Sequence, residues 1–241
     1  MYQEKNKKYI SGEAYDKRGS NSLLEKYVLD LWQPFLKNKI ANLSISNKVV
    51  DLGCGTGEYT QAAKNAKKIY AVDVSFVMLK ICRQKLKDFN QAEIINVNVK
   101  DFKMSQDFAD LVIAIGVWEY IVPEELMKTI KMITKNRGRV IVVFPNIYND
   151  LNWMRSFIKM SPCGGSPEGG KQIALKPNYI RKIFKKDFKL LESASFGVVS
   201  WIPKKLQFLA LPVWKFCDFL WSPFQKLLPL GVNTYYLFER K

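Results

Sequence analysis

Hydrophobic residues along this chain fall in short, almost uninterrupted runs that alternate with segments of helical spacing. Five such runs are predicted strands, at residues 49–52, 69–72, 94–97, 111–115 and 140–144. Strands that are apolar on both sides are typical of a parallel sheet covered by helices on both faces. The pattern therefore predicts an α/β fold, a three-layer sandwich around a mostly parallel sheet.

Apolar positions at helical spacing predict helices between and after these strands. The predicted helices lie at about residues 21–32, 59–66, 76–86, 123–133, 151–160 and 177–186. Pro34 is expected to kink or end the first of them, because proline lacks the N–H group that continues a helix.

The C-terminal part adds two predicted strands, 188–196 and 233–240, and brings the expected sheet to seven strands. The connection between them, 197–231, is long and rich in Trp and Phe. Because a structureless connection of this length is unusual in a compact domain, a helical insertion is expected here. Its short helices should be broken at Pro203, Pro212, Pro223 and Pro229.

The chain thus divides into an N-terminal arm and helix, a core, an insertion and a final strand. The predicted bounds are 1–44 (a lid), 45–196 (a Rossmann-like core that binds the ligand), 197–231 (the aromatic-rich insertion) and 232–241 (the last core strand). The insertion is expected either to pack over the site as an internal lid or to contact a membrane.

Charge and residue types narrow the function classes. The formal net charge is +16, which attracts polyanions such as nucleic acid or an anionic membrane, although a lysine-rich solvated surface accounts for it equally. The chain has no histidine, so Ser-His-Asp triads and His-ligated metals are excluded, and no metal site is expected. Four scattered cysteines and an N-terminus without an apolar stretch favour a cytoplasmic location.

A glycine-rich turn follows the first predicted strand, with Gly53, Gly55 and Gly57 on alternate positions. Such a strand-to-helix turn lets a ligand approach the main chain. The position after Gly57 is Glu58, so the G-x-G-x-x-G dinucleotide pattern is absent, and so is the lysine of a P-loop. Asp51 and Glu58 flank the turn, where carboxylates would repel a pyrophosphate and attract a cation.

Asp73 ends the second predicted strand, 22 residues after Asp51, where a carboxylate can accept hydrogen bonds from ribose hydroxyls. Asp101 and Glu119 follow two further strands at the same expected edge of the sheet. The predicted ligand therefore combines a ribose and an adenine with a positive charge.

These residues resemble the motifs of class I S-adenosylmethionine-dependent methyltransferases. The stretch 51–57 is similar to the family's motif I, 72–75 to its acidic ribose turn, 101–102 to its adenine contact, and 116–121 to the loop after its fourth strand. The final strand resembles the family's seventh, antiparallel strand. The resemblance implies S-adenosylmethionine as the cofactor, held by Asp51, Gly53, Cys54, Gly55, Gly57, Asp73, Val74, Asp101, Phe102 and Gly116.

Methyl transfer mainly requires that the acceptor is aligned with the methyl group and that water is excluded. A general base helps only where the acceptor loses a proton. Glu119 and Tyr120 are the candidates for that role. Relatives acting on catechol-like quinone precursors often carry Glu-His at this position, so the Tyr120 of this chain departs from them.

The expected function is methyl transfer to an O, N or C atom of a small, apolar or lipid-like acceptor. The aromatic and lysine residues of 197–231 suggest an anionic membrane surface as a further partner. The alternatives are an RNA or DNA methyltransferase, a methyltransferase for polar natural products or sugars, and a non-catalytic cofactor-binding protein. Nucleic acid is disfavoured because the aromatic residues do not interleave with basic ones. The sequence does not specify an oligomeric state.

Overall fold

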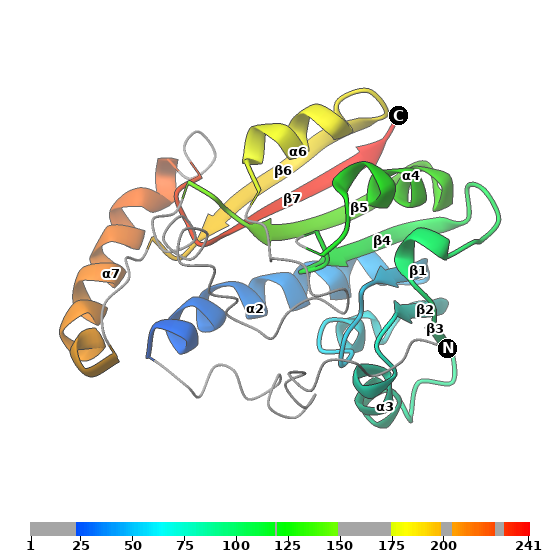
Figure 1. Cartoon of the computed structure of the whole chain (residues 1–241), viewed down its shortest axis with the longest axis horizontal. Helices are drawn as coiled ribbons and strands as arrows, with labels where there is room; N and C mark the ends of the chain where they lie inside the picture. Colours follow the sequence, from blue (N-terminus) through cyan, green and yellow to red (C-terminus); the bar gives the residue numbers. More distant parts are fainter. Residues whose placement is uncertain (1–22, 119, 149–174, 199–203, 225–228) are drawn as a thin grey trace.

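The computed structural model describes residues 23–118, 120–148, 175–198, 204–224 and 229–241, and in these ranges it shows a seven-stranded sheet between two layers of helices (Figure 1). The strands are β1 (Lys48–Leu52), β2 (Lys68–Asp73), β3 (Ala92–Asn96), β4 (Ala109–Ile115), β5 (Thr134–Pro145), β6 (Phe188–Phe196) and β7 (Asn233–Arg240). Their order is β3-β2-β1-β4-β5-β7-β6. The α/β sandwich predicted from the hydrophobic pattern is confirmed.

Strand β7 has the opposite direction to both of its neighbours in the sheet. The pairs β1–β2, β1–β4, β2–β3 and β4–β5 are parallel, whereas β7 is antiparallel to both β5 and β6. It therefore lies between these two strands and not at an edge of the sheet. Asn233 is opposite Pro145, so β7 begins at the edge where the carboxyl ends of β1 to β5 meet.

Helices cover both faces of the sheet (Figure 1). Helices α4 (Pro123–Ile133) and α6 (Pro177–Phe184) pack on one face with Val50 and Leu52 of β1, and α2 (Leu23–Ser44) packs on the other with Val49. Helix α3 (Phe76–Lys85) lies on the same face as α2, against Ala71 of β2. The alternation of β1 side chains between two buried clusters is what an apolar run in a covered sheet requires.

Helix α2 continues through Pro34 to Ser44, so of the two expected effects of this proline the end of the helix is wrong, and a kink stays a prediction. Both halves of the helix are anchored by buried side chains. Leu24, Tyr27 and Val28 precede the proline, while Leu36 and Ile40 follow it and are fully buried against the sheet. Tertiary packing on both sides therefore outweighs the loss of one helical hydrogen bond.

Two other helix predictions are corrected. The segment after the glycine turn forms only the short 3-10 helix η2 (Thr60–Ala63) and not a helix over 59–66. In the insertion, α7 (Gln207–Trp221) runs unbroken through Pro212, flanked by the short 3-10 helices η4 (Lys204–Leu206) and η5 (Ser222–Phe224). Pro212 is exposed, and buried Ala210 and Trp214 hold the helix against α2 on either side of it. The helix predicted at 151–160 lies outside the described residues.

The loop after β4 is anchored in the core by Trp118. This side chain is almost fully buried, packs against Phe184 at a ring-centroid distance of 5.8 Å, and donates a hydrogen bond from Nε1 to the carbonyl oxygen of Ala114 at 3.0 Å. A buried indole whose N–H group is hydrogen-bonded holds the start of this loop against the core.

We expect Trp118→Phe to lower the free energy of unfolding by about 1–3 kcal/mol, because it removes this hydrogen bond and leaves a small cavity. The matched control is Trp221→Phe, at the half-buried end of α7, which should cost less than about 1 kcal/mol. Urea unfolding followed by circular dichroism measures both. Equal losses in the two variants would show that Trp118 has no special anchoring role.

Candidate functional site

The glycine turn is fastened to the end of strand β2. The backbone N–H groups of Gly53 and Cys54 both donate to the carbonyl oxygen of Val72, at 2.8 and 3.0 Å. Gly53 has a φ of +75°, and a Cβ atom there would lie 2.8 Å from Cγ2 of Val117. Gly53 is therefore required both for the turn and for the close packing of the loop after β4.

Gly55 is different, because its backbone is open on the side of the described residues. Its φ is +54°, and a Cβ atom at this position would have no neighbour within 4 Å among the residues that the structure describes. The main chain at Gly55 can therefore be approached closely by a ligand, as a nucleoside-binding turn requires.

Asp73, at the end of β2, connects the glycine turn after β1 to the backbone just before α3. Its Oδ2 atom accepts a hydrogen bond from the N–H of Gly55 at 2.9 Å, and its Oδ1 atom accepts one from the N–H of Ser75 at 2.7 Å. Burial raises the pKa of this carboxyl group, and the backbone N–H groups oppose the rise. Each carboxylate oxygen can accept a second hydrogen bond, so Asp73 can still bind a pair of hydroxyl groups.

Asn96 fixes the backbone beside Asp73. From the end of β3, its Nδ2 atom donates to the carbonyl oxygens of Asp73 at 3.0 Å and of Val74 at 2.9 Å. Val74 thus takes part in the site through its backbone. Asn96 was not predicted as a site residue, although its signal was present: it is a polar residue at the end of a predicted strand.

Asp51 is buried within β1 and accepts a hydrogen bond from Oγ1 of Thr60 at 2.6 Å. Burial raises the pKa of Asp51 to about 7, with a further rise from the nearby charge of Asp73 and an opposing effect of the Thr60 hydrogen bond. A cation bound near this carboxyl group would favour its ionised form. Thr60 was also missed, because a single threonine nine residues after the aspartate gives no sequence signal.

The second flanking carboxylate, Glu58, is already neutralised. It forms ion pairs with Lys37 of α2 and, at 2.9 Å, with Lys85 of α3. Burial disfavours its charged form, but the hydrogen bonds from the two lysines outweigh burial and lower the pKa of Glu58. The sequence argument that both Asp51 and Glu58 would attract a cation is therefore wrong for Glu58, which instead ties the turn to two helices.

The structure separates the two residues of the predicted adenine contact. Phe102 is buried in the core cluster that also contains Val72 and Val117. Asp101 is exposed at the end of the 3-10 helix η3 (Val99–Asp101). Phe102 is therefore part of the core and Asp101 lies at the surface, and the adenine-contact role of both residues stays a prediction.

The remaining predicted residues lie around the same edge. Gly116 ends β4 with a φ of +64° and donates from its N–H to Val143 at 3.1 Å. Cys54 is buried, and its pKa is raised by a hydrogen bond with Cys82 and by burial, so its thiol is not poised as a nucleophile. Gly57 packs against Cys82, where a Cβ atom would lie 2.8 Å from Sγ.

Of the two candidate bases, only Tyr120 is described. It is half-buried, and its N–H donates to the carbonyl oxygen of Val117 at 3.1 Å. Glu119 lies outside the described residues. The proposed base role of both residues stays a prediction.

Comparison with known proteins agrees with this geometry. Residues 50–142 match a family described as a methyltransferase domain. Demethylmenaquinone methyltransferase of Bacillus subtilis is 32% identical over 111 residues, which cover 43% of this chain and 47% of that protein. Ribosomal RNA small subunit methyltransferase A of Alkaliphilus metalliredigens is 30% identical over 101 residues, which cover 41% of this chain and 34% of that protein. The chain spans about half, or less, of these relatives.

The fold has a counterpart of nearly full length among solved structures. Magnesium protoporphyrin IX methyltransferase of Synechocystis, with bound SAH, aligns at a TM-score of 0.64 and 16% identity, covering 96% of this chain and 95% of that chain. The matched region 50–142 runs from β1 into β5 and includes the glycine turn and Asp73. Residues 50–142 thus form a methyltransferase domain, and the chain has the Rossmann-like fold of class I S-adenosylmethionine-dependent methyltransferases.

Proposed function

We propose that this chain transfers a methyl group from S-adenosylmethionine to an O, N or C atom of a small, apolar or lipid-like acceptor drawn from a membrane surface. The observation that carries the methyl-transfer part is the hydrogen bond between Gly55 and Asp73. It places a carboxylate that can bind two hydroxyl groups beside a stretch of open main chain, which is the arrangement that an adenosyl ligand needs.

The chain's own residues supply binding and orientation. Asp73 would hold the ribose hydroxyls, the open backbone at Gly55 would face the rest of the nucleoside, and Asp51 would face the positive charge. When bound, S-adenosylmethionine supplies a methyl group already activated by its sulfonium. The protein then has to align the acceptor with that methyl group and keep water out.

The apolar nature of the acceptor is supported by the exposed surface of helix α7. Helix α7 carries several exposed Phe and Leu side chains. Strand β7 follows α7 in the sequence and begins at the carboxyl edge of the sheet. Just before β7, the carbonyl oxygen of Val232 accepts a hydrogen bond from the N–H of Asn146 at 2.9 Å. The match to a methyltransferase named for demethylmenaquinone is consistent with a small-molecule acceptor.

RNA is the second candidate acceptor. The net charge of +16 and the match to a ribosomal RNA methyltransferase favour it. Against it, the exposed aromatic residues of the described part lie mostly on α7 and η5 among exposed Leu and Val side chains, with Phe76 on α3 and Tyr148 after β5 apart, and they do not line a basic groove. Transfer to a polar natural product or sugar, and cofactor binding without catalysis, have no observation of their own in their favour.

We expect Asp73→Asn to weaken binding of S-adenosylmethionine about 10- to 100-fold, because an amide cannot accept at both positions and loses charge-assisted hydrogen bonds. Isothermal titration calorimetry measures the affinity. The matched control is Asp88→Asn, an exposed aspartate after α3, which should bind like the wild type. Unchanged affinity in the Asp73 variant would remove the ribose role of this residue.

Asp51 makes stability and cofactor binding depend on pH. Its folded pKa, about 7, is above the ordinary value of 3.8, so its contribution to stability is fully present below pH ~4 and is lost as the pH rises through ~7. Relative to Asp51→Asn, the free wild type should therefore lose roughly 2–4 kcal/mol between pH 4 and 8.

The cofactor should act in the opposite direction. A bound sulfonium favours ionised Asp51, so the affinity of the wild type should rise by up to about tenfold from pH 6 to 8, while that of Asp51→Asn stays level. Thermal unfolding and calorimetry across this range measure both effects. Parallel pH profiles for the two proteins would contradict the assignment.

The acceptor is tested by offering methyl-labelled cofactor to separated lipid, small-metabolite, protein and RNA fractions. We expect label in the lipid or apolar small-molecule fraction, and at least about fivefold less with Asp73→Asn at a cofactor concentration near the wild-type Kd. Label in RNA would replace the proposed acceptor by the second candidate. Label in no fraction, despite cofactor binding, would favour a non-catalytic role.

A further inference from the structure

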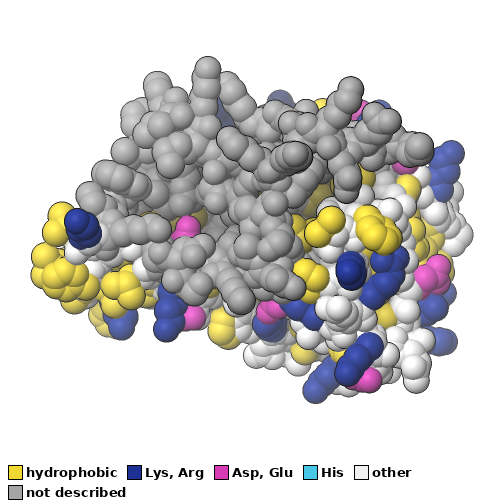
Figure 2. All heavy atoms as spheres, turned by 60° about the horizontal axis from the view of Figure 1, so that its bottom comes forward, with side chains coloured by type: hydrophobic (Ala, Val, Ile, Leu, Met, Phe, Trp, Pro, Cys, Tyr) yellow, Lys and Arg dark blue, Asp and Glu magenta, His cyan; other side chains and the backbone are white. Residues whose placement is uncertain are grey.

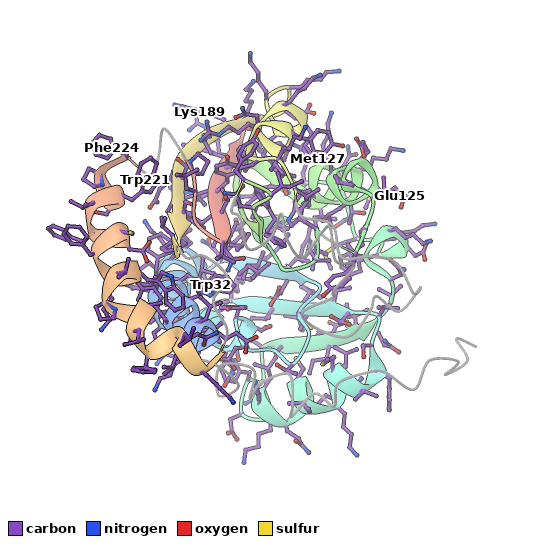
Figure 3. The ribbon with its side chains drawn as sticks, turned by 60° about the vertical axis from the view of Figure 1, so that its left-hand side comes forward. Trp32, Glu125, Met127, Lys189, Trp221 and Phe224 are labelled. Carbon is purple, nitrogen blue, oxygen red and sulfur yellow. The ribbon has the colours of Figure 1, made fainter. Side chains whose placement is uncertain are left out.

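Within the described residues, helix α7 is docked to the rest of the protein along one buried stripe. Gln207, Ala210 and Trp214 are buried, and the last two pack with Leu24, Tyr27 and Val28 of α2. The Oε1 atom of Gln207 accepts a hydrogen bond from the N–H of Leu24 at 3.1 Å. In Figure 3, α7 stands beside α2 with many of its side chains directed away from the molecule.

The rest of the α7 surface is apolar and exposed. Six large hydrophobic side chains of the helix are between 51% and 73% exposed: Phe208, Leu209, Val213, Phe216, Phe219 and Leu220. Leu206 and Phe224 extend this surface at either end. Figure 2 shows hydrophobic side chains gathered at the left-hand end of the molecule, where α7 lies, with Lys or Arg side chains among them. We call these eight residues the outer face of α7. A continuous apolar surface of this kind marks an interaction site.

The charged side chains beside the outer face, on η4 and α7, are lysines. Lys205 and Lys215 are exposed beside the outer face. Asp218 is the acidic residue of α7, and it is turned toward the protein: its Oδ2 atom accepts from the Tyr27 hydroxyl at 2.5 Å and its Oδ1 atom from the N–H of Val198 at 2.7 Å. The outer face therefore combines aromatic and aliphatic side chains with two exposed lysines, which is the composition of an interfacial helix.

The length of α7 excludes a transmembrane position. Its 15 residues correspond to about 22 Å, whereas a bilayer core is about 30 Å thick. Within the described ranges, no helix has the length and apolar character needed to cross a membrane. A helix that is apolar on its outside and docked on its inside can, however, lie in the plane of the interface.

We propose that the outer face of α7 binds the surface of an anionic phospholipid membrane, with its Phe and Leu side chains among the acyl chains and its lysines at the head groups. A second copy of the chain fits less well. A two-fold contact between two outer faces would bring the exposed Lys205 and Lys215 of both copies into one interface, and like charges repel. The proposed function connects this surface to an apolar acceptor, but membrane binding does not depend on it.

The experiment is co-flotation of the full chain with vesicles of phosphatidylcholine, with or without phosphatidylglycerol. We expect binding to the anionic vesicles at low salt and weaker binding at ~0.5 M salt. Phe216→Gln/Phe219→Gln should bind at least about tenfold more weakly at both salt concentrations. Lys215→Gln should bind about fivefold more weakly at low salt only.

The matched control is Ile45→Gln/Leu191→Gln, which replaces two exposed apolar side chains away from α7 and should bind like the wild type. Thermal unfolding is the measurement that checks whether each variant is folded. The proposal is overturned if the wild-type protein co-floats with neither type of vesicle. It is also overturned if an α7 variant binds the vesicles like the wild type. A dimer in sedimentation that Phe216→Gln/Phe219→Gln dissociates would also overturn it, in favour of a second copy as the occupant.

Calorimetry with S-adenosylmethionine on the same preparations separates this proposal from the proposed function. Vesicle binding without cofactor binding overturns only the proposed function. Cofactor binding without vesicle binding overturns only the membrane role of α7.

Discussion

The carboxylate of Asp73 is the contact on which the site depends. It accepts N–H groups from Gly55 and Ser75, and so it connects the glycine turn after β1 to the start of α3. The backbone of Val72 adds two hydrogen bonds to the same turn. Because β1 and β2 are neighbours in the sheet, the pairing of these two strands already brings the turn and the carboxylate together. The fold therefore pre-organises the site before any ligand is bound.

Charge is then distributed unevenly around this contact. Glu58 is held by Lys37 and Lys85 and stabilises the outside of the turn, whereas Asp51 is buried without a cationic partner in the described residues. The buried carboxyl group carries a raised pKa, which makes its ionisation sensitive to a bound cation. The two carboxylates that flank the turn in sequence thus differ: Glu58 is paired within the protein, and Asp51 is the one proposed to face the ligand.

The sheet and the position of Asp73 could be predicted from the sequence because both follow from local patterns. Apolar runs identify buried strands, and a polar residue at the end of such a run lies at the carboxyl edge. The pairing of Glu58 could not be predicted, since its partners lie 21 and 27 residues away on two different helices. Nor could the continuity of α2 and α7 through Pro34 and Pro212, because tertiary packing on both sides of each proline decides it.

The central claim is that this pre-organised edge binds the adenosyl part of S-adenosylmethionine. A crystal structure of the chain with S-adenosylhomocysteine tests it most directly. The account predicts both ribose hydroxyls within hydrogen-bond distance of the Asp73 carboxylate and the nucleoside against the backbone of Gly55. A ligand bound elsewhere, or a ribose that does not contact Asp73, would contradict it.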